Sequence, residues 1–371
     1  MKQLNLVFAL LLTVAFIACS DDNEEVQEKN VDPGTIQLIP SITGAEVTRG
    51  EPENQTTTDI DYVGNFRLLA VETNTGTTPT SYYDTPLLKV ETAGGRAVYA
   101  DSGTHYDKRW PVNDGSLILH AYAPPSAFEG VFTGITTVPT FNANAEYNFG
   151  TYTLPDVTNQ KDLLFAYIGT GSRTTVAGNF NKGKVSFTFE HLLSRVTFEV
   201  RKAETGFLNN DKVYVTEIGI RQVFGTATGK TNNSKIFEWS TRTSPSNYTV
   251  QPTTGVEITK TNFDTDEYFT TEGAHQTITQ NKNNSLFMLP HSTTEFESNN
   301  SVLYIKFRVG QTYATASNGE DIEWKQPLKD KESWESGKWV NYRFTINPNY
   351  IEVEAVKVKG WNKVNVPLEV H

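Results

Sequence analysis

The sequence predicts an all-β protein of the sandwich or barrel type. Short apolar runs recur between turn signals, and several of them alternate apolar and polar residues with a period of two. Aromatic residues make up 12% of the chain, and Thr, Asn and Gly are abundant, a mix that favours strands joined by polar turns. No window keeps a convincing helical period over three turns. Short strands at this spacing are typical of β-sandwiches and β-barrels.

The N-terminal segment is predicted to be a signal peptide, residues 1–18. Its apolar run from Leu6 to Ile17 is short for a membrane-spanning helix but suits the core of a signal peptide. Cys19, the only cysteine, follows Ala18 directly, an arrangement that resembles the bacterial lipobox. The resemblance implies acylation of the Cys19 thiol, palmitate included, and anchoring in outer-membrane lipid. An ordinary secretory signal with a chance cysteine is the alternative.

Residues 19–34 are predicted to be an acidic tether. The run Ser20-Asp21-Asp22-Asn23-Glu24-Glu25 cannot bury apolar surface, so it should remain solvated. It also resembles the acidic export signal that sends some Gram-negative lipoproteins to the cell surface; a tether without such an address is the alternative. The formal net charge of −11 argues against nucleic acid as a partner.

The length suggests two domains, and we place the boundary at the polar stretch from Gly178 to Gly183. The N-terminal domain, residues 35–182, opens with a strand that carries apolar residues at alternate positions from Ile36 to Ile42. Pro40 should confine this strand to a sheet edge, because proline lacks the N–H that a central strand donates. Further strands of this domain are expected at 66–71, 87–90, 96–100, 117–122 and 162–168.

The C-terminal domain, residues 183–371, shows cleaner alternation. Val185, Phe187 and Phe189 should face one way while the residues between them face the other. Later strands are expected at 196–200, 213–220, 303–309, 342–346, 351–353 and 364–370.

Motifs for catalysis or cofactor binding are not found. The chain has no GxSxG and no HExxH, and its six histidines show no metal-ligand spacing. His120 and His191 lie in apolar strands and are expected to be hydrogen-bonded core or edge histidines, with metal ligation as the alternative. Residues 225–231 look like a phosphate loop that is one residue short, and we interpret them as a Gly-rich hairpin. The sequence therefore predicts a protein that is not an enzyme and has no cofactor or metal.

Three tryptophans form a candidate ligand face. Trp324, Trp334 and Trp339 cluster in the sequence and could stack on a sugar ring. The alternative is that these large residues fill the core at strand ends.

Four segments resemble one known family. They are Trp110 followed by 117–124 (LILHAYAP), 162–166 (DLLFA), 185–198 (VSFTFEHLLSRVTF), and 339–346 (WVNYRFTI) with Trp361 beyond it. In this order, behind Cys19, they resemble the fimbrillin family, the type V pilins and their accessory subunits. The segment 185–198 is the most specific of the four.

This resemblance implies two tandem transthyretin-like Greek-key β-sandwich domains in a structural or tip subunit of a pilus. The subunit would be non-enzymatic and would mediate adhesion or biofilm formation, with a host protein or glycan as its target. It also implies assembly by donor-strand exchange with other fimbrial subunits. A trypsin-like extracellular protease cuts the lipoprotein precursor after an arginine, the first strand leaves, and another subunit's strand fills the groove.

This chain has residues that match those roles. Arg49-Gly50 ends the first-strand segment, residues 35–49, in a context that a trypsin-like enzyme could cleave. The candidate donor strand, residues 361–371, carries apolar side chains at every second position, namely Val364, Val366, Leu368 and Val370. Pro367 departs from the pattern, since it removes one ladder donor. The alternatives are that Arg49 is one surface arginine among many and that the last strand pairs within its own domain.

Two other functions remain open at the level of sequence. A surface glycan-binding lipoprotein that does not polymerise would present exposed coplanar aromatic rings. A glycoside hydrolase on a sandwich scaffold would need two carboxylates in a cleft, which sequence spacing cannot reveal in a β-fold. The family-like segments do not distinguish a stalk subunit from a tip or an anchor.

Overall fold

A computed structural model gives the fold of the protein. It describes residues 35–42, 65–73, 78–82, 86–90, 96–104, 106–135, 139–208, 211–251, 255–259, 286–316, 320–328, 333–348 and 350–360. Cys19, Arg49, Gly50 and the candidate donor strand 361–371 therefore lie outside the described residues.

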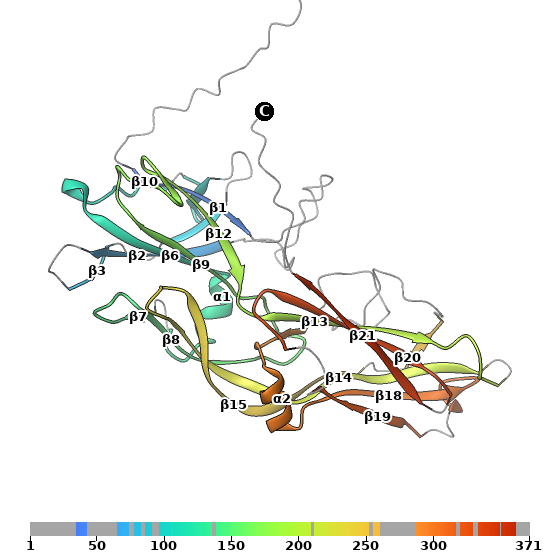
Figure 1. The fold of residues 1–371 in the computed structure, drawn as a ribbon. Coiled ribbons are helices and arrows are strands. Elements are labelled where there is room, and N and C mark those ends of the chain that lie inside the picture. Colours follow the sequence, from blue (N-terminus) through green and yellow to red (C-terminus); the bar gives the residue numbers. More distant parts are fainter. Residues whose placement is uncertain are drawn as a thin grey trace, which may run out of the picture.

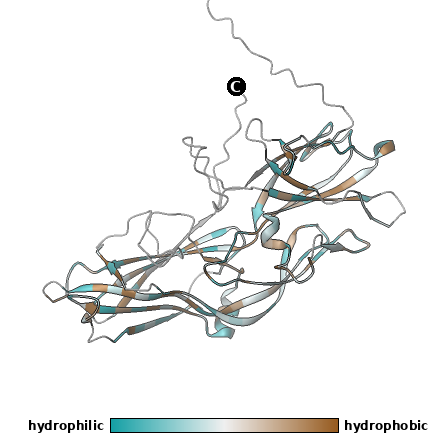
Figure 2. Ribbon diagram, turned by 180° about the vertical axis from the view of Figure 1, so that it is seen from behind, coloured by the Kyte–Doolittle hydropathy of each residue, from teal (hydrophilic) through white to brown (hydrophobic). Residues whose placement is uncertain are grey.

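The described chain is almost entirely β-structure, which confirms the predicted fold class. Its strands form three sheets, and its α-helices are α1 (Pro125–Phe128) and α2 (Thr293–Asn299). The two halves lie end to end in an elongated molecule (Figure 1). Hydrophobic segments run along the strands of both halves (Figure 2), as the period-two pattern requires.

The N-terminal half is built on a ten-stranded sheet. Its strand order is β10 (Val176–Ala177), β11 (Phe180–Asn181), β12 (Lys184–His191), β9 (Leu164–Gly171), β6 (Ser116–Ala123), β2 (Asn65–Thr73), β4 (Leu87–Val90) and β5 (Ala97–Tyr99). Two more strands join beside this path: β1 (Gln37–Ile42) pairs with β12 in parallel, and β3 (Thr80–Ser81) pairs with β2. One face of β12 buries Val185, Phe187 and Phe189, as the alternation predicted.

The C-terminal half contains the other two sheets. The seven-stranded sheet has the order β19 (Ile322–Pro327), β18 (Val302–Gly310), β14 (Lys212–Thr231), β8 (Tyr147–Thr153) and β7 (Thr140–Phe141), with β15 (Phe237–Val250) and β16 (Val256–Ile258) also on β14. The four-stranded sheet has the order β17 (Leu286–Met288), β13 (Ser194–Lys202), β20 (Lys338–Ile346) and β21 (Ile351–Gly360). One continuous apolar core packs between these sheets and reaches one face of the ten-stranded sheet.

The chain passes between the halves later than the expected boundary. Residues 178–183 are not a linker, because they form the tight turns that connect β10, β11 and β12 within the ten-stranded sheet. Lys182 and Gly183 have φ angles of 47° and 90°, as a two-residue hairpin turn requires. The crossing lies at Leu192 and Leu193, between β12 and β13.

Two strands of the first half also cross over. β7 and β8 belong to the seven-stranded sheet, since β8 pairs with β14 from Thr226 to Lys230. This pairing places the suspected phosphate loop, residues 225–231, at the end of a long strand. Neither a phosphate loop nor a Gly-rich hairpin is formed by these residues. They are strand residues of β14, and the turn to β15 follows them.

Aromatic side chains hold the two halves together. Phe165 of β9 lies 5.8 Å from Phe149 of β8 and 5.4 Å from Phe237 of β15, measured between ring centroids. Phe237 in turn meets Trp239 edge-on at 5.0 Å. These rings belong to three strands from both halves, so the junction is part of the core.

His120 is buried in this junction, which confirms a core histidine but not the hydrogen bond expected of it. Its ring lies 5.2 Å from that of Tyr147 and 5.6 Å from that of Phe165, and neither ring nitrogen has a hydrogen-bond partner within the described chain. Burial therefore lowers the pKa of His120 to about 3. His191, by contrast, is paired with a carboxylate described below.

Within the part of the chain described, no helix has the length and apolarity needed to cross a membrane. The same residues contain no group of three or more His, Cys, Asp or Glu side chains that could hold a metal ion.

We expect His120 to make the protein less stable in acid. The unfolded chain binds a proton at His120 below about pH 6.5, whereas the folded chain does so only near pH 3. Stability is therefore lost as the pH falls through this window, by about 3 kcal/mol between pH 7 and pH 4 for this residue alone. Urea unfolding of His120→Phe at the two pH values should show a loss smaller than that of the wild type by this amount. Tyr147→Phe, which changes the same cluster without changing a group that titrates in this range, should keep the wild-type loss. Equal pH dependence of all three proteins would contradict the assignment.

Candidate assembly site at the first strand

The first strand, β1, packs its inward side chains into the apolar core of the N-terminal half. Ile36, just before the strand, and Leu38 are 0% and 1% exposed, and Pro40 is also buried, so alternate residues point inward. The strand runs parallel to β12, with Leu38 opposite Val185 and Pro40 opposite Phe187. The predicted alternation is thus confirmed over these positions.

β1 lies at a sheet edge, as Pro40 predicted. Among the described strands it pairs only with β12. Its beginning is fixed by two backbone hydrogen bonds, from Ile36 N to Lys108 O (2.8 Å) and from Gln37 N to Gly183 O (3.0 Å). Thr35 and Arg109 form an isolated antiparallel bridge. A strand held in this way can leave without breaking the ladder of any other described strand pair.

Aromatic rings lie beneath β1. The Phe66 ring meets those of Phe187 and Phe189 edge-on at 6.1 Å and 5.7 Å. Ile36 and Leu38 belong to the same buried cluster. Removal of β1 would therefore expose an apolar surface beside a free edge of β12, which is the geometry that accepts an added strand.

The crossing between the halves is fixed by polar contacts beside this core. His191 Nδ1 and Asp162 Oδ2 lie 2.6 Å apart, and both side chains are buried. Burial raises the pKa of Asp162, and the contact with His191 opposes this shift. Leu192 N donates to Leu163 O at 2.8 Å, so the end of β12 is tied to the start of β9.

Arg195 continues the contacts on the other side of the crossing. Its guanidinium carbon lies 4.3 Å from the centre of the Trp339 ring, a cation–π contact. The Trp339 indole N–H donates to Thr197 Oγ1 at 2.8 Å. Three segments of the sequence that resembled one family, 162–166, 185–198 and 339–346, therefore meet at a single place in the fold.

Comparison with known proteins identifies the family of this chain. The family model described as "Fimbrillin-like" matches residues 48–361. The chain belongs to the fimbrillin-like family. Membership supports a pilus-type subunit of a cell-surface appendage that interacts with other fimbrial subunits.

Solved structures include related folds. A fimbrial protein from Bacteroides vulgatus ATCC 8482 is 17% identical, with a TM-score of 0.54 over 88% of this chain and 99% of that one. Candidate cell adhesion proteins from Bacteroides uniformis and Bacteroides ovatus are each 16% identical, with TM-scores of 0.47 and 0.48. Each match covers 88% of this chain and 97% of the chain of the solved structure. No curated protein sequence matches the chain significantly. The first of these structures supports the fold of this fimbrillin-like protein.

The three tryptophans of the candidate ligand face do not form one exposed surface. Trp334 is 1% exposed, and its indole N–H donates to Tyr342 Oη at 2.9 Å. Trp324 packs edge-on against Phe344 at 6.0 Å, while Trp339 is half-buried under Arg195. Trp334 fills the core, and Trp324 and Trp339 are half-buried against it, so the structure favours packing over a shared ligand face.

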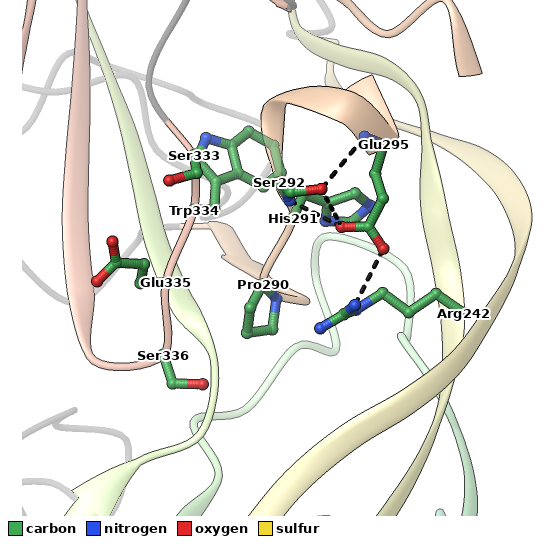
Figure 3. Close-up of a pocket in the computed structure, with 9 residues that line it drawn as sticks. All are labelled: Arg242, Pro290, His291, Ser292, Glu295, Ser333, Trp334, Glu335 and Ser336. Carbon is green, nitrogen blue, oxygen red and sulfur yellow. Dashed lines mark hydrogen bonds and ion pairs between the residues drawn. The ribbon is translucent and has the colours of Figure 1, made fainter. Parts of the chain in front are cut away.

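A pocket that the sequence did not predict lies beside α2 (Figure 3). It has a volume of about 530 Å³ and is lined by Arg242, Pro290, His291, Ser292, Glu295, Ser333, Trp334, Glu335 and Ser336. The pattern Ser292-x-x-Glu295 was a readable signal for the helix start, and both bonds of that capping box are present. Its proximity to Arg242 and Glu335 results from tertiary packing.

We expect the inward side chains of β1 to carry most of its contribution to stability. Leu38→Ala should lower the free energy of unfolding by about 2–4 kcal/mol, because the cavity opens in a closed aromatic cluster. Gln37→Ala on the same strand should cost less than about 1 kcal/mol. Chemical denaturation of both variants tests this, and equal losses would show that β1 is not seated as described.

We expect the Asp162–His191 contact to stabilise the crossing. Asp162→Asn should lower the free energy of unfolding by about 1–3 kcal/mol, since a charge-assisted buried bond is weakened. The exposed Asp156→Asn is the matched control and should change little. A neutral effect of Asp162→Asn would place the stability of the junction in the aromatic core alone.

Proposed function

We propose that this protein is the precursor of a pilus subunit that assembles by proteolysis-linked donor-strand exchange. The observation that carries the proposal is the seating of β1. It is an edge strand that fills an apolar cluster with alternate side chains and pairs with β12 alone among the described strands. The role would be adhesion or biofilm formation at the cell surface, as a stalk or tip subunit.

The precursor would reach the surface as a lipoprotein. Acylated Cys19 would hold it in the outer membrane, with residues 19–34 as a spacer. A trypsin-like protease would then cut between Arg49 and Gly50, shortly after β1 ends at Ile42. The transthyretin-like Greek-key topology of both domains belongs to the same proposal.

Cleavage would matter because it removes the high effective concentration of β1 at its own groove. While β1 is covalently attached, it returns to its own groove faster than a strand from another molecule can enter. After cleavage the short N-terminal piece can diffuse away. The vacated cluster then favours any strand that restores the buried apolar contacts, worth about 1.5–3 kcal/mol for each large side chain.

Residues 361–371 would supply that strand. They follow β21, which ends at Gly360 opposite Lys338. Val364, Val366, Leu368 and Val370 have the same two-residue spacing as Ile36, Leu38 and Pro40. Pro367 falls between the inward positions, so an edge location of the donor would tolerate it, as β1 tolerates Pro40.

Polymer formation in bacteria tests the proposal. Surface protein from cells producing the wild type should begin at Gly50 and form heat-labile ladders of polymers. Arg49→Ala should leave a chain beginning at acylated Cys19 without polymers, whereas the exposed Arg173→Ala should behave as the wild type. Deletion of 361–371 should allow cleavage but abolish ladders of this subunit.

Two results would contradict the proposal. Polymers of normal length from the deletion variant would exclude 361–371 as the donor. A wild-type chain that keeps acylated Cys19 and never polymerises would point instead to an anchor subunit or to the alternative, a surface glycan-binding lipoprotein.

A further inference from the structure

We propose that, once β1 has left, residues 361–371 fill the groove of their own subunit and close it to other subunits. We call the product a capped subunit. The inference rests on the proposed function, because it uses the same vacated groove and the same apolar segment. Two observations carry it: the place at which β21 ends and the direction in which the groove runs.

β21 ends beside the crossing between the two halves. Its last residue, Gly360, pairs with Lys338 of β20. The residue before Lys338, Gly337, donates its N–H to Leu193 O at 2.9 Å. Leu193 is one of the two residues of the crossing. The chain beyond Gly360 therefore starts in the middle of the molecule, next to the N-terminal half.

The groove under β1 opens toward the same place. β1 and β12 are parallel, and both run toward the C-terminal half (Figure 1). The last residue of β1, Ile42, pairs with Phe189. Phe189 lies four residues before Leu193 in the chain, which is at most about 13 Å of extended backbone. One end of the groove thus lies close to the point at which residues 361–371 begin.

The segment is long enough to use this entrance. Its eleven residues reach about 36 Å when extended. The six residues of β1 occupy only about 20 Å of groove, which leaves length for the passage from Gly360. Val364, Val366 and Leu368 would then take the places of Pro40, Leu38 and Ile36, in that order.

The segment would enter in the direction opposite to that of β1. A strand that starts at the crossing runs antiparallel to β12, whereas β1 runs parallel to it. The reversal keeps the inward face, because side chains alternate with a period of two in either direction. Antiparallel pairing is also slightly more stable per residue. The rings of Phe66, Phe187 and Phe189 would be covered again by apolar side chains.

Capping would compete with polymerisation. The segment is tethered to its own subunit at Gly360, so its effective concentration at its own groove exceeds that of a strand from another molecule in dilute solution. β1 prevents capping in the precursor, because it occupies the groove. A subunit that is cleaved away from a growing pilus would therefore become a capped monomer, which neither accepts nor donates a strand.

Cleavage of the purified, unprocessed subunit after Arg49 tests the proposal, with Cys19→Ser to remove the lipid. The cut wild type should lose its N-terminal piece and stay monomeric in light scattering at low and at high protein concentration. Val366→Asp should lower the melting temperature of the cut protein by about 10 °C, since a charge would enter the apolar groove. The uncut variant should melt like the uncut wild type, which excludes a general folding defect. Asn365→Asp, the same added charge on the outward face, should behave as the wild type.

Two results would overturn capping. Polymers of the cut wild type at either concentration would show that the groove takes a strand from another subunit, which contradicts capping and supports strand exchange. Equal melting temperatures of the cut wild type and cut Val366→Asp would show that the segment is not in the groove. The polymer ladders in bacteria decide strand exchange separately, so the two hypotheses fail independently.

Discussion

The crossing from β12 to β13 is the constraint on which the rest of the structure depends. The chain leaves one sheet and enters another within two residues, Leu192 and Leu193. Because β12 also pairs with β1, β9 and β11, its position fixes both the groove under β1 and the start of the C-terminal half. The Asp162–His191 contact holds one side of the crossing, and Arg195 on Trp339 holds the other.

Such a junction should keep the two halves of this fimbrillin-like protein fixed to each other. A flexible linker would let the halves move independently, whereas this protein shares one apolar core across them. β8 strengthens the connection, since it leaves the first half in sequence and joins the sheet of the second. Buried aromatic rings cannot separate without exposing their full area to water, so the two halves should resist separation.

The N-terminal half combines this rigidity with one strand that is held differently from the others. Most of its strands have neighbours on both sides or turn tightly into the next strand, but β1 enters from outside the sheet path and pairs in parallel. The contacts that seat β1 are chiefly apolar and involve Ile36 and Leu38. Apolar contacts are non-directional, so they are not specific to one strand. A strand with the same alternation would bury the same cluster, and the proposed strand exchange rests on this property.

The sequence by itself determined the all-β class, the edge position of β1 and the inward face of β12. Each follows from a local rule: side chains alternate along a strand, and proline lacks a backbone donor. The family was also readable from the segments 162–166, 185–198 and 339–346, whose residues meet at the crossing. Only the tertiary structure decided the true boundary, the transfer of β8, the burial of Trp334 and the pocket of Arg242, Ser333 and Glu335. Those features depend on which distant strands pair and which faces cover each other, and period-two patterning specifies a face without specifying its partner.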